Sequence, residues 1–133
     1  MTFSSFKIFS KKSGTLIPIS LTKDIPFKSK RIFLIYGNKE FVRGNHAHKK
    51  CSQFFLPIHG KMELSVIDKK NNKKVKLDSK KGKGVLLKPL TWCKLSFKTK
   101  NSVIMVFCDR EYEFNDYIEK YEDFINIIKK KKK

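Results

Sequence analysis

The sequence predicts a mainly β protein, a sandwich or barrel of the jelly-roll type built from short antiparallel strands, with one C-terminal α-helix. Three observations support this class. Apolar residues recur with period two along most of the chain, the alternating segments are short and closely spaced, and a helical period occurs only near the C-terminus. At 133 residues the chain can build one substantial core, so we expect a single domain over residues 1–133.

The strands are expected where apolar and polar residues alternate between turn-forming residues. Pro26 separates the first two strands from the others, because proline cannot donate a hydrogen bond to a central strand ladder. A polar stretch at residues 68–72 predicts a hairpin turn. The strands are predicted at residues 6–9, 16–21, 31–36, 53–58, 61–67, 74–77, 85–87, 92–97 and 103–107, with one more around the histidine pair described below.

At the C-terminus, residues 115–128 predict a helix that Asn115 or Asp116 could cap. An aromatic and apolar stripe recurs there at helical spacing, and we expect it to pack on the outside of the barrel. Residues 129–133 form a lysine tail that we expect to be solvated. The stripe consists of Tyr117, Tyr121, Phe124 and Ile128.

The charge of the chain limits its partners. A formal net charge of +19 suggests a polyanionic partner, of which nucleic acid is the obvious example. The excess is nearly all lysine spread through loops, however, and arginine occurs only at Arg31, Arg43 and Arg110. Sites for nucleic acid usually concentrate arginine or stack aromatic residues in a basic groove. We therefore expect no specific nucleic-acid binding, but keep a non-enzymatic basic binding module as an alternative.

The cysteines and the hydropathy pattern bear on the compartment. Cys51, Cys93 and Cys108 have neither a CxxC nor a zinc-site spacing, and they predict free thiols in a reducing cytoplasm. The N-terminal segment has no continuous apolar run, and no stretch approaches the roughly 18 apolar residues that a membrane span needs. We expect a cytoplasmic protein without a membrane span.

The most informative segment is RGNHAH at residues 43–48. On a β-strand, side chains two positions apart point to the same face, so His46 and His48 should project into one space about 7 Å apart. Imidazole is the side chain whose unperturbed pKa lies near neutrality, so this pair suits either metal ligation or proton transfer. His59, which precedes a turn at Gly60, is expected to be solvated.

The spacing resembles the first motif of the cupin superfamily, in which a His-x-His pair is followed by a glutamate and then by a glycine. Here Gln53 occupies the place of the glutamate and Gly60 that of the glycine. The resemblance implies a cupin-type jelly-roll barrel. A metal site of this superfamily uses three histidines and one carboxylate, and Gln53 is a neutral, weaker ligand than a carboxylate.

A second cupin motif is recognisable but incomplete. Gly84 and Pro89 resemble its glycine and proline, whereas Thr91 replaces its second glycine and Lys94 stands where the third histidine would be. A protonated lysine cannot ligate a metal ion. Because two of the four ligands are absent, we expect no metal, and the histidine pair favours acid–base chemistry.

Four segments resemble one family within this group, the dTDP-4-keto-6-deoxyglucose 3,4-ketoisomerases. They cover nearly the whole chain: residues 24–35 resemble the "IPF…KR" segment, residues 43–50 the "RGxHAHKK" signature, residues 112–124 the closing "DYI..Y..F" segment, and Pro89-Leu90-Thr91-Trp92 accompanies them. The resemblance implies an isomerase that moves the ketone of a dTDP-linked 4-keto-6-deoxyhexose from C4 to C3, with no cofactor, on a route to a 3-amino-3,6-dideoxyhexose of surface glycans. It also implies a homodimer, in which the strands of residues 1–23 could be exchanged.

The resemblance and the chemistry together assign expected roles. His46 is expected to be the base that removes the C3 proton, His48 a proton relay, and Arg43 the cation that stabilises the enediolate if Gly44 introduces a β-bulge. Tyr36 is the only phenol near the expected position of a family tyrosine. The residues expected to bind the substrate are Arg31, Lys50, Gln53, Lys88 and Trp92, although Trp92 could instead close the core.

A second enzymatic alternative stays open. Sugar-nucleotide epimerases of the same cupin group act on similar ketones, but they typically pair a histidine with a carboxylate. The sequence has no acidic residue at the corresponding spacing from His46 and His48, which favours the ketoisomerase. The configuration that the product acquires at C4 stays open as well.

Overall fold

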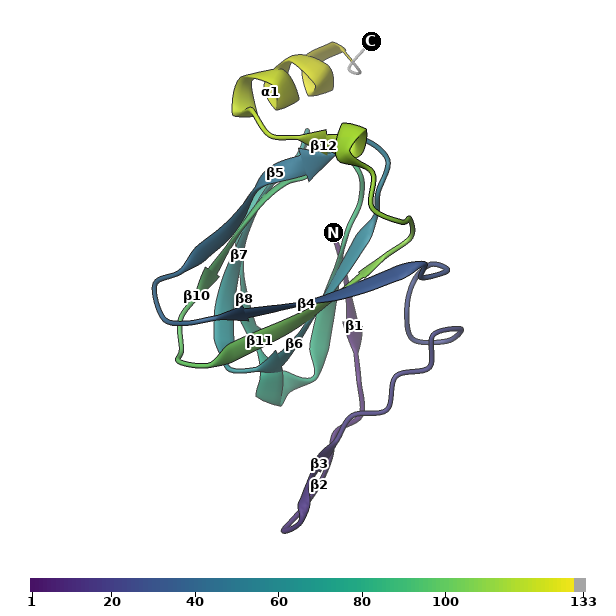
Figure 1. Ribbon diagram of the computed structural model, residues 1–133, viewed down its shortest axis with the longest axis vertical. Helices are drawn as coiled ribbons and strands as arrows, with labels where there is room; N and C mark the ends of the chain where they lie inside the picture. Colours follow the sequence, from purple (N-terminus) through teal and green to yellow (C-terminus); the bar gives the residue numbers. More distant parts are fainter. Residues whose placement is uncertain (131–133) are drawn as a thin grey trace.

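A computed structural model describes residues 1–130 and consists of two five-stranded antiparallel sheets that face each other as a barrel (Figure 1). The first sheet contains, in spatial order, β1 (Thr2–Ser5), β9 (Lys83–Leu87), β6 (Gln53–His59), β11 (Ser102–Cys108) and β4 (Arg31–Gly37). The second contains β12 (Tyr117–Ile118), β5 (Val42–His48), β10 (Trp92–Phe97), β7 (Lys61–Ile67) and β8 (Asn72–Asp78). The predicted mainly β jelly roll is confirmed.

The core lies between the two sheets, because alternate residues of each strand point inward. On β10, Cys93, Leu95 and Phe97 are buried in this core, while Lys94 between them is exposed. Inward residues of β6, β7, β8, β9 and β11 belong to the same cluster. The period-two pattern of the sequence therefore marks the strands from residue 31 to residue 108, where the observed and predicted bounds differ by only a few residues.

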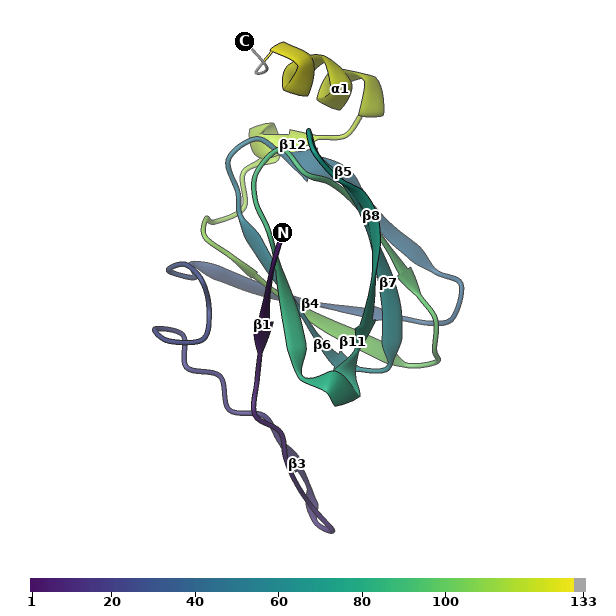
Figure 2. The same ribbon diagram turned by 180° about the vertical axis from the view of Figure 1, so that it is seen from behind.

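The N-terminal strands differ from the prediction. β1 begins at Thr2 and pairs with β9, whereas β2 (Phe9–Lys11) and β3 (Gly14–Leu16) form a separate hairpin that projects from the barrel (Figures 1 and 2). The strand expected at residues 16–21 stops early, because Pro18 lacks an N–H and the Asp24 carboxylate accepts a hydrogen bond from the Ser20 N–H at 2.7 Å. This bond closes a turn where the prediction had an extended segment.

The C-terminal helix also begins later than predicted. Residues Phe114–Asp116 form a 3₁₀-helix (η2), Tyr117–Ile118 form β12 beside β5, and α1 runs over Tyr121–Lys130. Neither Asn115 nor Asp116 caps α1, because the Asp116 side chain is turned into the barrel, where its contacts are described below. Of the predicted lysine tail, residues 129 and 130 belong to α1, and residues 131–133 lie outside the described part of the chain.

Helix α1 lies across one end of the barrel (Figure 1). Its buried residues Phe124 and Ile128 pack on Ala47, Trp92 and Ile118 in a small apolar cluster outside the main core. A short 3₁₀-helix, η1 (Ser79–Lys81), connects β8 to β9 at the other end. Within residues 1–130, no helix combines the length and the apolar character needed to cross a membrane.

Candidate active site

The site begins with an irregularity in β5. The register with β10 shifts next to Cys93, so that Asn45 is an extra residue in β5, and both Gly44 and Asn45 have positive φ (88° and 68°). Glycine suits this position, because a Cβ on Gly44 would lie 3.1 Å from the Cys93 carbonyl oxygen in a backbone conformation that L side chains rarely adopt. The predicted bulge is therefore confirmed, and it brings Arg43 and His46 to the same cavity.

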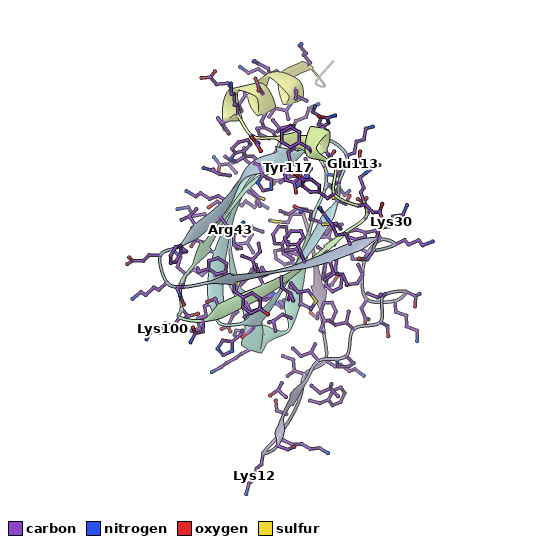
Figure 3. All side chains as sticks on the ribbon, in the orientation of Figure 1. Lys12, Lys30, Arg43, Lys100, Glu113 and Tyr117 are labelled. Carbon is purple, nitrogen blue, oxygen red and sulfur yellow. The ribbon has the colours of Figure 1, made fainter. Side chains whose placement is uncertain are left out.

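The cavity has a volume of about 500 Å³ and lies between the two sheets. Figure 3 shows Tyr117 at the end of the barrel beneath α1 and Arg43 on the side formed by β5. The cavity combines an apolar wall with a few polar groups, which is typical of sites for organic ligands. Its lining residues are Phe33, Leu34, Ile35, Tyr36, Arg43, Gly44, His46, Gln53, Phe55, Cys93, Leu95 and Tyr117.

His48 forms a buried pair with Asp116. The distance from His48 Nδ1 to Asp116 Oδ2 is 3.0 Å, and both residues are buried. The backbone N–H groups of Lys50 and Cys51 also donate to this carboxylate, at 2.7 and 3.2 Å. Burial acts to raise the pKa of Asp116, but these donors outweigh it and lower the pKa below the ordinary value. The carboxylate is therefore ionised and fixes the orientation of the imidazole.

This pair corrects the view that no acid accompanies the histidines. Asp116 is 68 residues from His48 in sequence. It reaches His48 because it directly precedes β12, and β12 pairs with the strand β5 that carries His48. Burial lowers the pKa of His48, and Asp116 offsets only part of that effect. With Nδ1 bonded to the carboxylate, His48 Nε2 is buried and has no hydrogen-bond partner among residues 1–130. A neutral imidazole with a free Nε2 has the form that a general base needs.

His46 is the second imidazole of the site. Its ring centre lies 5.1 Å from that of His48, with the two planes nearly perpendicular. Burial is the main cause that lowers the pKa of His46, and the charges of His48 and Arg43 lower it further. Both imidazoles are therefore neutral near pH 7, which suits proton transfer in either direction.

Tyr117, whose spacing in the sequence predicts a place in the helical stripe, is instead a phenol of the site. Its ring centre lies 4.3 Å from that of His48 and 5.1 Å from that of His46, and it lines the cavity. Burial raises the pKa of Tyr117, with Arg31 acting in the opposite direction, so the phenol is protonated at neutral pH. Tyr36, the phenol chosen from the sequence, also lines the cavity but is 73% exposed, because its position on β4 faces outward. Tyr117 is the phenol in contact with the histidines.

Arg31 and Gln53 meet at the sulfur of Cys108. Arg31 Nη2 lies 3.5 Å and Gln53 Nε2 3.7 Å from this sulfur. The neighbouring Cys51 thiol, and then Arg31 and Gln53, donate toward the Cys108 sulfur and lower the pKa of this thiol against the effect of burial. Arg31 Nε is buried without a partner in the described chain, so this guanidinium can still donate. Gln53 lies in the cavity wall, as its strand parity predicted.

Three predicted binding residues lie elsewhere. The side chain of Trp92 points away from the cavity, because side chains alternate along β10 and that of its neighbour Cys93 points inward. Trp92 packs on Phe124, and its Nε1 donates to Asn45 Oδ1 at 3.3 Å. The Lys50 side chain is exposed, and only its backbone N–H serves the site. Lys88 is exposed in a separate groove near α1. In this chain none of the three side chains lines the cavity.

Comparison with known proteins identifies the family. The protein family described as "FdtA: WxcM-like, C-terminal" matches residues 1–129, so the chain belongs to this family. The chain is also similar to the TDP-4-oxo-6-deoxy-alpha-D-glucose-3,4-oxoisomerase of Aneurinibacillus thermoaerophilus, with 32% identity over 127 residues, 95% of this chain and 91% of the relative. The resemblance to sugar 3,4-ketoisomerases drawn from the sequence motifs is thereby confirmed.

Solved structures agree with this family. The sugar 3,4-ketoisomerase QdtA of Thermoanaerobacterium thermosaccharolyticum, in complex with TDP, matches with a TM-score of 0.88 and 30% identity, over 98% of this chain and 95% of that one. A histidine-to-asparagine mutant of QdtA, solved with TDP-4-keto-6-deoxyglucose, matches with the same score and identity, over 97% and 94%. The rmlC epimerase of Mycobacterium tuberculosis matches with a TM-score of 0.73 at 12% identity, over 86% and 66%, and shares the cupin-type jelly roll alone.

Proposed function

We propose that this protein is an isomerase that moves the ketone of dTDP-4-keto-6-deoxyglucose from C4 to C3. The observation that carries the proposal is a cavity next to which His46, Tyr117 and the Asp116-bound His48 converge, in a chain that belongs to a family with such enzymes. The carbonyl at C4 acidifies the hydrogen at C3. A base removes that proton, an enediol forms, and a proton returns to C4 while the C3 hydroxyl becomes the ketone. The substrate is neither oxidised nor reduced overall, so the reaction itself requires no redox cofactor.

Asp116 favours His48 as the base, which reverses the assignment expected from the sequence. A carboxylate that accepts from Nδ1 holds the imidazole in the tautomer with a free Nε2 lone pair, and it stabilises the imidazolium that forms when Nε2 takes the C3 proton. His46, which lines the cavity 5.1 Å away between ring centres, is then placed to carry a proton to C4 or from the C3 hydroxyl. The phenol of Tyr117 contacts both rings and can act as a further acid.

Cationic and polar groups around the cavity suit an enediolate and a nucleotide. Arg43 is permanently charged and lines the cavity through the β5 bulge, so we assign it to the developing negative charge. The amide of Gln53, which lines the cavity, is assigned to substrate binding. The unpartnered Nε of Arg31 is assigned to the same role, because its guanidinium neighbours Cys108 and the cavity residue Tyr117. Tyr36 stays a proposal at the rim of the cavity. His48 and Arg31 stand one layer behind the lining residues, each beside Tyr117, which lines the cavity. We do not assign Lys50, Lys88 or Trp92, because the two lysine side chains are exposed elsewhere and Trp92 packs on Phe124.

The direct test is incubation of the purified protein with dTDP-4-keto-6-deoxyglucose and identification of the product by NMR. We expect the 3-keto isomer, with solvent deuterium incorporated at C4. An epimer at C5 with the ketone still at C4 would instead establish the epimerase alternative, which the His48–Asp116 pair on its own does not distinguish. The same spectra give the configuration at C4. If neither product forms and the protein binds DNA or RNA in a salt-sensitive way, the basic binding module is correct.

We further propose a homodimer, in which residues 1–23 could be exchanged. Strand β4 lies at the edge of its sheet with Ile32 and Leu34 on its exposed face, and the projecting hairpin exposes Phe9 and Leu16. An uncovered edge strand with apolar side chains favours pairing with a second chain. Sedimentation should give twice the mass of the chain, and a stable monomer at micromolar concentration would contradict this. The cytoplasmic location predicted from the cysteines stays a proposal.

A further inference from the structure

We propose that His48, Cys51 and Asp116 form a binding site for a thiophilic divalent cation, best matched by Zn²⁺, and that occupation of this site stops the enzyme. One potential ligand atom from each residue lies within 4.8 Å of the other two, and all three residues are buried. The binding step depends only on this geometry, whereas the inhibition rests on the proposed function.

The donor atoms match the preferences of zinc. Imidazole nitrogen, thiolate sulfur and carboxylate oxygen bind Zn²⁺ at about 2.0–2.3 Å, usually in a tetrahedral arrangement. Donors at these distances lie about 3–4 Å apart, and His48 Nδ1 and Asp116 Oδ2 are already 3.0 Å apart. The sulfur of Cys51 therefore needs to approach by only about an ångström. The fourth position is left for water, as in zinc sites with three protein ligands.

The charges at the proposed site and the backbone hydrogen bonds to Asp116 determine which metal ions it should bind. Cys51 is a thiol that donates to the Ser52 carbonyl at 3.4 Å, so a bound metal must displace its proton to solvent, as it displaces the Nδ1 proton of His48. The resulting thiolate and the Asp116 carboxylate together neutralise a divalent cation, so the buried site carries no net charge when it is filled. The N–H group of Lys50 donates to Asp116 Oδ1 at 2.7 Å, and that of Cys51 donates to Oδ2 at 3.2 Å. Hydrogen bonds of this kind commonly orient a metal-binding carboxylate, and Oδ2 keeps a second lone pair, the one now directed at His48 Nδ1, for the metal ion. Arg31 is a neighbouring cation that opposes any bound ion. This repulsion disfavours Mg²⁺ and Ca²⁺, which prefer oxygen ligands, more than Zn²⁺ bound through sulfur.

The proposed zinc site is not the metal site that the cupin motifs form. In the motifs Gln53 and Lys94 stand at two of the ligand positions, whereas the proposed site uses Cys51 and Asp116 on the Nδ1 side of His48. A metal bound at Nδ1 replaces the proton there and leaves the neutral imidazole protonated at Nε2. His48 would then have no lone pair with which to accept the C3 proton. The metal would act as an inhibitor by fixing the wrong tautomer of the base.

The binding test uses Co²⁺ as a spectroscopic substitute for Zn²⁺ on the chelator-treated wild-type protein. We expect a near-ultraviolet thiolate-to-cobalt charge-transfer band that saturates at one equivalent and disappears when Zn²⁺ is added. Cys51→Ala should lose the band. Cys93→Ala removes a thiol in the same core cluster and should keep it, as should Cys108→Ala. Absence of the band in the wild type, or its persistence in Cys51→Ala, overturns the proposal. Equal loss in Cys108→Ala overturns it as well, because the site would then be a dithiol.

Two further measurements keep the test independent of folding and of turnover. Wild-type crystals soaked in ZnCl₂ should show an anomalous peak between the three ligand atoms, and a peak elsewhere contradicts the site without any variant. In the isomerase assay, Zn²⁺ should suppress wild-type turnover at least tenfold and a chelator should restore it. Cys51→Ala should have normal turnover without zinc and resist this inhibition. Equal inhibition of this variant would refute the assignment, while a lack of any isomerase activity would refute the proposed function and leave the cobalt result to stand.

Discussion

The two faces of strand β5 serve different purposes. His46 and His48 project toward the interior of the barrel, where they meet Tyr117 and Asp116. Ala47, between them, faces the opposite side and packs in the apolar cluster beneath α1. If the histidines act as proposed, consecutive residues of one strand contribute to chemistry and to stability separately, because a strand alternates its side chains. The comparison teaches that substitutions around β5 should divide into those that affect turnover and those that affect folding.

The largest effect is expected on the inner face. His48→Asn should lower turnover by about 10²–10⁴-fold, because it removes a general base and retains a polar group of similar size. The free energy of unfolding should change little, since an amide can still donate to Asp116. Steady-state kinetics and circular dichroism on the same preparation measure both quantities. Turnover at the wild-type level in this variant would refute the assignment of the site.

His46→Asn is the matched variant within the pair. We expect a loss of about two orders of magnitude, but with a different partial reaction retained. If His48 removes the C3 proton, the His46 variant should still exchange that proton with solvent deuterium, and the His48 variant should not. Exchange lost in the His46 variant and kept in the His48 variant would restore the opposite assignment, which the sequence alone suggested.

Helix α1 packs on the outer face of β5 through Phe124. Phe124→Ala should therefore reduce stability without a direct effect on chemistry. Phe124 is fully buried against Trp92, and removal of a buried phenylalanine side chain costs about 3–5 kcal/mol of unfolding free energy. Asn126 lies on the exposed side of the same helix, and Asn126→Ala should stay within about 0.5 kcal/mol of the wild type. Urea denaturation measures both. If Phe124→Ala abolishes turnover in fully folded protein, the two faces are not separate.

The strands and the histidine pair could be predicted because both depend on local alternation. His46 and His48 share a face through parity alone, and Gly44 signalled a bulge since only glycine readily takes its backbone conformation. Trp92 and Lys88 lie close to the second motif in sequence, and this proximity does not determine where their side chains point. Trp92 is on β10, and packing against α1 and the opposite sheet decides which face of that strand is inward. Lys88 follows the end of β9 and is exposed.

Asp116 and Tyr117 could not be assigned from the sequence for a different reason. Aspartate is a common helix cap, and Tyr117 fits the helical spacing of the stripe that ends at Ile128. The helix begins only at Tyr121, because residues 117–118 pair with β5 instead. The pairing brings together residues 68 positions apart, a contact that no local pattern encodes.

A smaller effect is expected when the support of the base is removed. Asp116→Asn should lower turnover, but by less than the roughly 10²–10⁴-fold expected when the imidazole itself is removed, because the imidazole is still present. It should also shift the low-pH side of the pH dependence of kcat/KM (its acid limb). The base must be neutral, so activity falls as the pH drops through the pKa of His48, which burial lowers and Asp116 partly raises. Loss of the carboxylate lowers this pKa further, so the acid limb should shift to lower pH. A limb that shifts upward or stays in place would show that another group limits the rate.

The smallest effect is expected from chelation. Exhaustive treatment with EDTA should not lower turnover, because the residues at the cupin metal positions are poor ligands. Lys94 is exposed on the outer face of β10, away from the cavity, and the Gln53 amide is directed to Cys108. The histidines thus lack the glutamate and the third histidine that complete a cupin metal site, and we expect the inner face of β5 to act by proton transfer. EDTA that abolishes turnover, with recovery on addition of a divalent ion, would show that metal chemistry operates on this face and that our interpretation of Gln53 and Lys94 is wrong.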